Sequence, residues 1–290
     1  MSGLQDEGVN AQVNDDTRRY YDLTLESADY PAWRGQPHRT LIICTLMRSG
    51  STLLGEAIYF AGGLGCPLEY FHQGFRPQFE ARWKSADFQA YVSTLHRLRT
   101  DPSGIFSVKL FWHDVLQMIC ERAPGVFDAL VGAPPPLVSA DDHRRLYEVI
   151  RAIFPNPTFV FLTRRDELRQ AVSNYVAEQT RRWRKFSPPA RDPGLPQIAY
   201  SFDDIFRLHV GNRRRSENWE SFFRANDLPY YKIVYEDLAL DYEGTLRKFF
   251  TAIGRPDAPI VPPRLRKQAD ARSEALLQKF LAEFRQRARG

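Results

Sequence analysis

Four short apolar segments recur along the chain, and each is followed by a longer stretch with helical character. They read TLIICTL (40–46), IFSVKLFW (105–112), PTFVFLT (157–163) and YYKIVYED (230–237). Short, continuous apolar runs are typical of strands that are buried on both faces of a parallel sheet. The alternation therefore predicts an α/β fold, in which a central, mainly parallel sheet carries helices on both faces.

The segments between these strands predict the helices and one long loop. Helices are expected over 51–62, 87–99, 113–122, 166–185, 202–225, 242–253 and 273–287, and over a segment that Ser139 or Asp141 caps and that ends at Ile153. Three glycines and Pro67 predict a loop over 63–78. Residues 1–17 are polar and predict a disordered tail. No internal repeat or linker divides the rest, so we expect a single domain over 18–290.

Composition argues against several classes of protein. Hydrophobic residues make up 43% of the 290 positions, which is enough for a sizeable core. No apolar run approaches the roughly 20 residues that a membrane-spanning helix needs, and the polar N-terminus does not resemble a secretory signal. Cys44, Cys66 and Cys120 lie far apart without CxxC spacing. This spacing favours a reducing cytoplasm over a disulfide framework or a zinc site built on cysteines.

The net charge of +5 indicates an anionic partner. The basic residues gather in TRRDELRQ (163–170), TRRWRKF (180–186) and RLRKQADAR (264–272). Arginines beside aromatic residues can follow a nucleic-acid backbone, but a solvated helix face explains the same pattern. No nucleic-acid recognition motif accompanies these clusters, so a nucleotide or an anionic acceptor is the favoured partner.

The first strand ends in a turn that is suited to an anion. The sequence CTLMRSGSTLLGEAIYF (44–60) places Arg48, Ser49, Gly50, Ser51 and Thr52 between a buried strand and a helix. Backbone N–H groups at a helix N-terminus bind phosphate or sulfate groups. The turn lacks the lysine of the GxxxxGK[ST] motif, which removes the usual charge arrangement for ATP chemistry. A nucleotide-dependent kinase and a non-catalytic nucleotide-binding or nucleic-acid-binding module nevertheless stay open as alternatives.

The third strand ends in a second basic turn, where Arg164 and Arg165 are followed by Ser173 in the next helix. The carboxyl ends of parallel strands lie along one edge of a sheet, so both turns are expected at the same edge. Two anion sites on one nucleotide fit 3′-phosphoadenosine 5′-phosphosulfate (PAPS). Arg164 lies nine residues before Ser173 and Arg165 eight. The order at the strand end favours Arg164, and Arg165 stays open as the alternative.

These segments resemble the Stf0-type bacterial sulfotransferases, a group that includes trehalose, lipopolysaccharide and Nod-factor sulfotransferases. The resemblance runs in order from about residue 40 to 285. It is carried by RSGSTLL (48–54), GCPLEYF (65–71), VKLFW (108–112), RQAVSNYVAEQTRRWR (169–184) and RKQADARSE (266–274). It implies a P-loop-like fold and transfer of a sulfuryl group from PAPS to a hydroxyl of a carbohydrate or glycolipid. A sulfuryl group carries less charge than a terminal phosphoryl group, so no metal cofactor is expected. No nucleic-acid partner is expected either, and the resemblance allows a homodimer.

The resemblance also assigns roles to single residues. The turn residues Arg48, Ser49, Gly50, Ser51 and Thr52 are implied to hold the 5′-phosphosulfate, and Arg164 and Ser173 the 3′-phosphate. Gln268 and Arg272 correspond to a segment that closes over the nucleotide. Glu69 in LEYF corresponds to the general base, and the Arg48 guanidinium suits the bridging oxygen of the donor. The roles of His72, His113 and Lys109 stay open between substrate contact and structural side chain.

Overall fold

The structure is a computed structural model that describes residues 22–131, 135–181, 183, 198–265 and 271–289. Four parallel strands form its sheet: β1 (Arg39–Thr45), β2 (Ile105–Phe111), β3 (Pro157–Thr163) and β4 (Tyr230–Val234). Their order in the sheet is β2-β1-β3-β4, and every neighbouring pair is parallel. The predicted α/β fold is therefore confirmed. Because β1 lies between β2 and β3, the turn that follows β1 is flanked by the ends of both neighbours.

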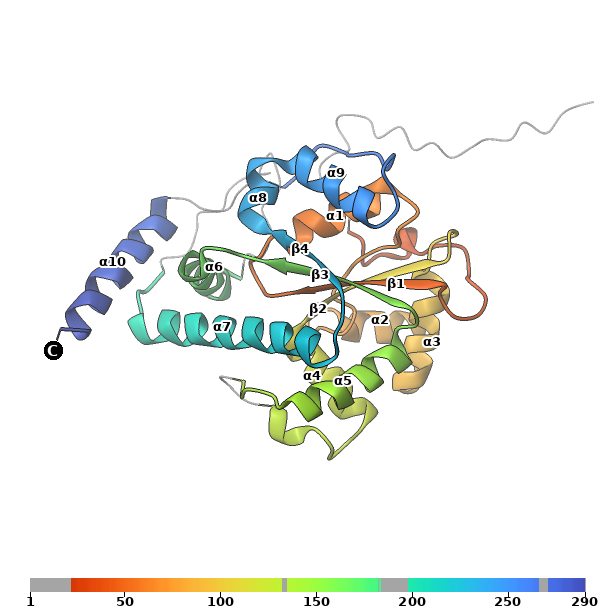
Figure 1. Ribbon diagram of the computed structural model, residues 1–290, viewed down its shortest axis with the longest axis horizontal. Helices are drawn as coiled ribbons and strands as arrows, with labels where there is room; N and C mark the ends of the chain where they lie inside the picture. The colour runs from red at the N-terminus through yellow and green to blue at the C-terminus, as the bar shows by residue number, and fades with distance from the viewer. Residues whose placement is uncertain (1–21, 132–134, 182, 184–197, 266–270, 290) are drawn as a thin grey trace, which may run out of the picture.

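Both faces of the sheet are covered, which explains the continuous apolar runs. Along β1, Ile42 and Cys44 belong to one core cluster, whereas Leu41 and Ile43 belong to another. Successive side chains of a strand point to opposite faces, so an apolar residue is needed at every position. Figure 1 shows α1 and α9 on one side of the sheet and α4, α5 and α7 on the other.

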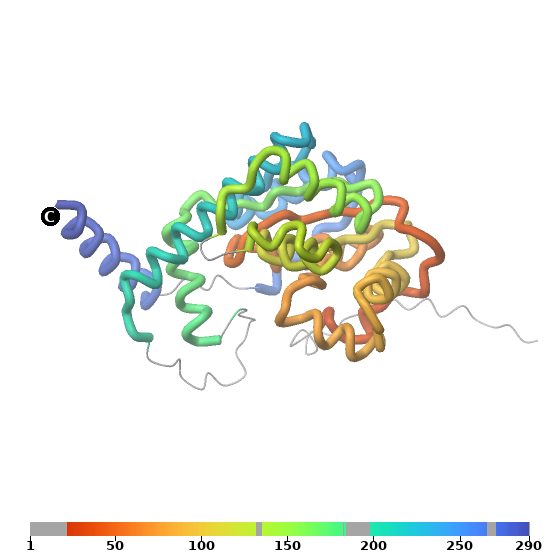
Figure 2. Tube along the Cα trace, turned by 90° about the horizontal axis from the view of Figure 1, so that it is seen from below, coloured from red at the N-terminus to blue at the C-terminus, as the bar shows by residue number. Residues whose placement is uncertain are grey.

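The helices agree with most of the predicted ranges. They are α1 (Ser51–Ala61), α2 (Arg76–Trp83), α3 (Phe88–Arg99), α4 (Trp112–Arg122), α5 (Ala140–Ile153), α6 (Glu167–Thr180), α7 (Phe202–Ala225), α8 (Tyr235–Leu240), α9 (Tyr242–Ala252) and α10 (Ala271–Arg287), with short 3₁₀ turns at Glu26–Ala28 and Asp128–Leu130. Ser139, and not Asp141, caps α5, since its hydroxyl accepts a hydrogen bond from the Asp142 N–H at 3.1 Å. Figure 2 shows α10 at one end of the molecule, beside α6 and α7.

Three boundaries differ from the sequence prediction. The loop expected over 63–78 gives way at Arg76 to α2, which begins with a proline in its first turn, where proline is tolerated. The helix expected over 166–185 ends at Thr180, because Arg181 adopts a left-handed conformation with φ of 57°. The fourth strand ends at Val234, and Tyr235 begins α8. The expected disordered tail over 1–17 lies outside the described residues.

Two further sequence expectations concern cysteines and membranes. All three cysteines are free thiols, and Cys44 and Cys66 are buried. Within the part of the chain that the structure describes, no helix combines the length and the apolar character that crossing a bilayer requires.

We predict that Trp219→Ala destabilises the fold by about 3–5 kcal/mol, because it removes a large buried side chain. Trp219 of α7 is fully buried, packs edge-on against Trp112 with ring centroids 5.0 Å apart, and donates from Nε1 to the Thr45 carbonyl at 3.3 Å. Urea unfolding measures the change. Leu240→Ala is the control: its side chain is 89% exposed, and the expected change is within about 0.5 kcal/mol. Equal effects for the two variants would contradict the packing role of Trp219.

Candidate active site

The turn between β1 and α1 presents backbone N–H groups without a side-chain cap. Gly50 is the N-cap residue of α1 and has φ of 85° and no side-chain cap hydrogen bond. The Ser49 hydroxyl is buried, lies 2.6 Å from Thr45 Oγ1, and donates to the Leu46 carbonyl at 2.6 Å. The buried hydroxyl of Ser49 therefore stabilises the turn through hydrogen bonds. The first turn of α1, which contains Ser51 and Thr52, offers backbone N–H groups of the kind that bind an anion.

Gly50 lies against the aromatic ring of Tyr235, the first residue of α8. A Cβ atom at position 50 would lie 2.4 Å from Tyr235 Cδ2, far inside van der Waals contact. The Arg164 guanidinium lies over the same ring, 5.0 Å from its centroid. Tyr235 thus links the turn after β1 to the turn after β3, a role that its sequence position did not reveal.

Arg48, Arg164 and Ser173 meet at the carboxyl ends of β1 and β3. Arg48 Nε donates to the Ser173 hydroxyl at 3.0 Å, and Arg164 Nη1 donates to the Arg48 carbonyl at 3.0 Å. The Arg164 side chain is 7% exposed and lies 3.4 Å from a Glu236 carboxylate oxygen. The structure therefore brings the two basic turns together, as the parallel topology led us to expect.

The two arginines impose a like-charge repulsion on each other. Burial, followed by the charge of Arg164, lowers the pKa of Arg48 to about 10. Arg48 also adopts a left-handed backbone conformation with φ of 61°, which is uncommon for a residue other than glycine. A pair of partly buried cations beside a left-handed backbone position is an arrangement that a bound anion would stabilise.

Arg165 points elsewhere. Its side chain is 64% exposed and pairs with Asp237 at 2.9 Å, and its N–H donates to a Glu236 carboxylate oxygen at 2.8 Å. Gln170 of α6, which the sequence analysis did not single out, donates from Nε2 to the Met47 carbonyl at 2.7 Å and so fastens α6 to the turn after β1.

Glu69 and Lys109 form a buried ion pair. Lys109 Nζ lies 2.7 Å from Glu69 Oε1, and the two side chains are 1% and 7% exposed. A backbone bridge joins Leu68 to Val108, and the Lys109 N–H donates to the Leu68 carbonyl at 2.9 Å. The loop that carries Glu69 is therefore attached to β2 by a single bridge. Lys109, whose role the sequence left open, is paired with the residue that the sequence analysis took as the general base.

The pair lies close to the first helix. The alkyl chain of Lys109 packs against Gly55 of α1, where a Cβ atom would lie 3.5 Å from Lys109 Cδ. Lys109 is also the register partner of Ile43 in β1. Glu69 thus lies on a loop that is bridged to β2, whereas Arg164 follows β3, and these two strands are the opposite neighbours of β1.

Of the two C-terminal residues that the sequence predicts to contact the nucleotide, the structure describes one. Gln268 lies outside the described residues. Arg272 is exposed in the first turn of α10, a helix that is tied to α6 by an ion pair of 2.5 Å between Arg169 and Glu274.

Comparison with known proteins identifies the family. The model of the Stf0 sulphotransferase family matches residues 40–283. The chain belongs to the Stf0 sulphotransferase family. This membership makes it a sulfotransferase and confirms the resemblance read from the sequence motifs.

Two curated relatives of this Stf0 sulphotransferase carry the name trehalose 2-sulfotransferase. The protein from Mycobacterium tuberculosis is 28% identical over 271 residues, which cover 84% of this chain and 95% of the relative. The protein from Mycolicibacterium smegmatis is 24% identical over 252 residues, which cover 82% and 93%. Among solved structures, the sulfotransferase domain of the Synechococcus PCC 7002 olefin synthase matches with a TM-score of 0.36 and 12% identity over 87% of this chain and 90% of that domain.

We predict that Gly50→Ala destabilises the protein by at least about 2 kcal/mol, because it combines a strained φ with a clash against Tyr235. Gly254→Ala is the matched control: Gly254 has a similar φ of 81°, but nothing lies within 4 Å of a Cβ atom there. Thermal unfolding of both variants separates the backbone strain from the clash. An equal loss of stability in the two variants would contradict the contact with Tyr235.

Proposed function

We propose that this sulfotransferase transfers a sulfuryl group from PAPS to a hydroxyl of a carbohydrate, with Glu69 as the general base. The observation that carries the proposal is the meeting of Arg48, Arg164 and Ser173 beside the uncapped N-terminus of α1. A donor with phosphate groups at two positions of one nucleoside needs such a pair of neighbouring anion sites.

The donor would lie across the ends of β1 and β3. Its 5′-phosphosulfate would accept hydrogen bonds from the N–H groups of the turn at 49–52, and its 3′-phosphate from Arg164 and Ser173. The Arg48 guanidinium would exchange its contact with Ser173 for the donor, because an oxygen of an anion is the stronger acceptor. The repulsion between Arg48 and Arg164 would be offset by the negative charge of the nucleotide.

The proposed transfer forms one bond to sulfur, breaks another and moves one proton. The acceptor hydroxyl oxygen forms a bond to sulfur while the bond from sulfur to the bridging phosphate oxygen breaks. The hydroxyl proton passes to the Glu69 carboxylate, and adenosine 3′,5′-bisphosphate leaves with its new charge facing Arg48. Such transfers depend mainly on positioning and on charge stabilisation. Lys109 places a positive charge 2.7 Å from the Glu69 carboxylate and fixes its orientation, which supports its use as a base.

A sugar is the acceptor that we propose. The named activity of both curated relatives is sulfation of trehalose, and this chain spans nearly their whole length. Trehalose is therefore the first acceptor to test, followed by lipid-linked sugars and lipopolysaccharide precursors.

The direct test incubates the purified protein with labelled PAPS and a panel of sugars that includes trehalose, and identifies sulfated products by mass spectrometry. ATP with Mg²⁺ replaces PAPS in a parallel reaction. A labelled sugar with PAPS, and none with ATP, supports the proposal. Turnover with ATP alone would support a kinase, and tight PAPS binding without any labelled sugar would contradict the proposed carbohydrate acceptor.

We predict that Glu69→Gln lowers kcat about 10²–10⁴-fold, because the amide cannot accept the proton of the acceptor hydroxyl. The affinity for PAPS, measured by calorimetry, should stay within about threefold of the parent value, since the donor would bind at the ends of β1 and β3. Glu80→Gln on neighbouring α2 is the matched control, with the same chemical change at a carboxylate that is 36% exposed. Full turnover in Glu69→Gln would rule out its role as the base.

We predict that Arg164→Ala weakens the binding of PAPS about 10–100-fold, because it removes one charge-assisted contact worth roughly 1.5–3 kcal/mol. Arg165→Ala serves as the control, since that side chain is 64% exposed and paired with Asp237. Its affinity should change less than about threefold. Titration calorimetry with adenosine 3′,5′-bisphosphate measures both, and a larger loss at Arg165 would reverse the assignment.

A further inference from the structure

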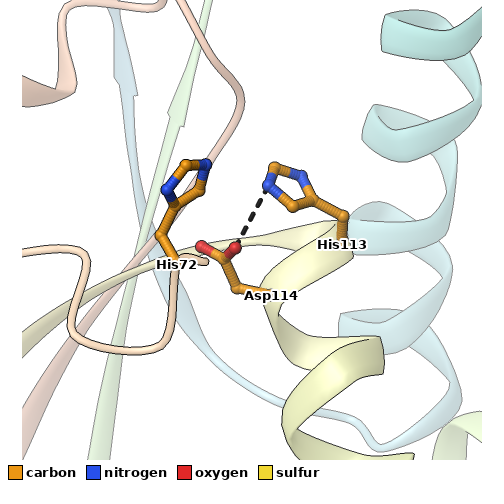
Figure 3. A group of neighbouring side chains, drawn as sticks. All are labelled: His72, His113 and Asp114. Carbon is orange, nitrogen blue, oxygen red and sulfur yellow. Dashed lines mark ion pairs between the residues drawn. The ribbon is translucent and has the colours of Figure 1, made fainter. Parts of the chain in front are cut away.

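Two histidines and an aspartate that the proposed transfer does not use lie together near the loop of Glu69. His72 belongs to that loop, and His113 and Asp114 belong to the first turn of α4. One nitrogen of each histidine and one Asp114 oxygen lie within 4.8 Å of one another. Figure 3 shows the two imidazole rings on either side of the Asp114 carboxylate.

The aspartate supplies a buried negative charge. The Asp114 side chain is fully buried, and its Oδ2 accepts a hydrogen bond from the Phe111 N–H at 3.4 Å. Its Oδ1 lies 3.1 Å from His113 Nε2, and the His113 side chain is 32% exposed. Among the described residues no lysine or arginine pairs with Asp114. A buried carboxylate without a permanent cation beside it needs a counter-charge.

The histidines are held by aromatic neighbours and by the backbone. The His113 ring stacks on Phe111 with centroids 5.5 Å apart, and the His72 ring lies 5.5 Å from the His113 ring. The His72 N–H donates to the Glu69 carbonyl at 3.1 Å, which fixes the turn between the two residues. These contacts orient the His113 ring beside Asp114 and leave His72 on a loop next to it, and the aromatic neighbours limit the access of solvent.

We propose that His72, His113 and Asp114 bind a divalent transition-metal ion of the zinc class. Imidazole and carboxylate together suit zinc, cobalt, nickel and copper, whereas magnesium and calcium require oxygen ligands. With bond lengths of about 2.0–2.2 Å, the ligand atoms of a tetrahedral site lie roughly 3.3–3.6 Å apart. The pair of His113 and Asp114 already has nearly this spacing, so His72, on a loop, is the ligand that must move closer.

Metal binding would break a hydrogen bond that His72 accepts from the backbone. The Gly74 N–H donates to His72 Nδ1 at 3.1 Å, so in the metal-free protein the ring proton sits on Nε2. A metal on Nε2 moves that proton to Nδ1, and a metal on Nδ1 takes the lone pair itself. In either case the Gly74 contact breaks, and the Gly74 amide signal in a nuclear magnetic resonance spectrum shifts on metal binding.

Three protein ligands leave one position of a tetrahedral ion for water or another oxygen. The metal would also join the loop that carries Glu69 to α4, and so restrict the motion of that loop. The site does not depend on the proposed sulfuryl transfer, because none of its ligands belongs to the donor site or to the pair of Glu69 and Lys109.

The test uses full-length protein without a histidine tag, treated with a chelator and then titrated with Co²⁺. We expect one ion per chain, with visible absorption bands that Zn²⁺ abolishes and Mg²⁺ at the same concentration does not. His72→Ala and His113→Ala should each weaken the binding of Co²⁺ at least about a hundredfold. His38→Ala, at an exposed histidine remote in sequence from all three ligands, should leave the binding unchanged.

Thermal unfolding without metal checks that both variants fold, which is expected because both histidines are only partly buried. Absence of saturable Co²⁺ binding in the micromolar range would overturn the proposal. So would Co²⁺ binding that survives both substitutions, or displacement of Co²⁺ by an equal concentration of Mg²⁺.

Discussion

The contact between the two basic turns is the constraint on which the rest of the site depends. Arg164 at the end of β3 donates to the Arg48 carbonyl at the end of β1, and Arg48 donates to Ser173 of α6. Parallel pairing of β1 and β3 allows this contact, because it places the ends of the two strands side by side. Two positive charges are held together there, and the proposed doubly anionic nucleotide would offset their repulsion.

β2, the other neighbour of β1, positions the residue that we propose as the general base. β2 carries Lys109, and its bridge to Leu68 brings Glu69 to the side of β1 that faces away from Arg164. The central strand thus has the two arginines at one neighbour and a buried carboxylate at the other. The proposed transfer assigns the donor to the arginines and the proton acceptor to the carboxylate, because sulfuryl transfer depends mainly on positioning and charge stabilisation.

Much of this arrangement was predictable from local patterns. The apolar runs gave the four strands, and the turn after the first strand pointed to an anion, since buried strands and helix N-termini follow short-range rules. Other features had no local signal. Helix α2 begins inside a stretch rich in turn residues, α8 interrupts an apparently continuous strand at Tyr235, and the ring that separates Gly50 from Arg164 comes from that helix.

The four strands, most of the helices, the basic turns and the family followed from the sequence alone, because periodicity and motif spacing are properties of neighbouring residues. Only the tertiary structure decided that Arg164 turns inward while Arg165 pairs with Asp237 in solvent, and that Lys109 meets Glu69. It also decided that His72 lies beside Asp114. These outcomes depend on which elements pack against each residue, and that packing joins segments about 40 to 70 residues apart, where spacing along the chain carries no information.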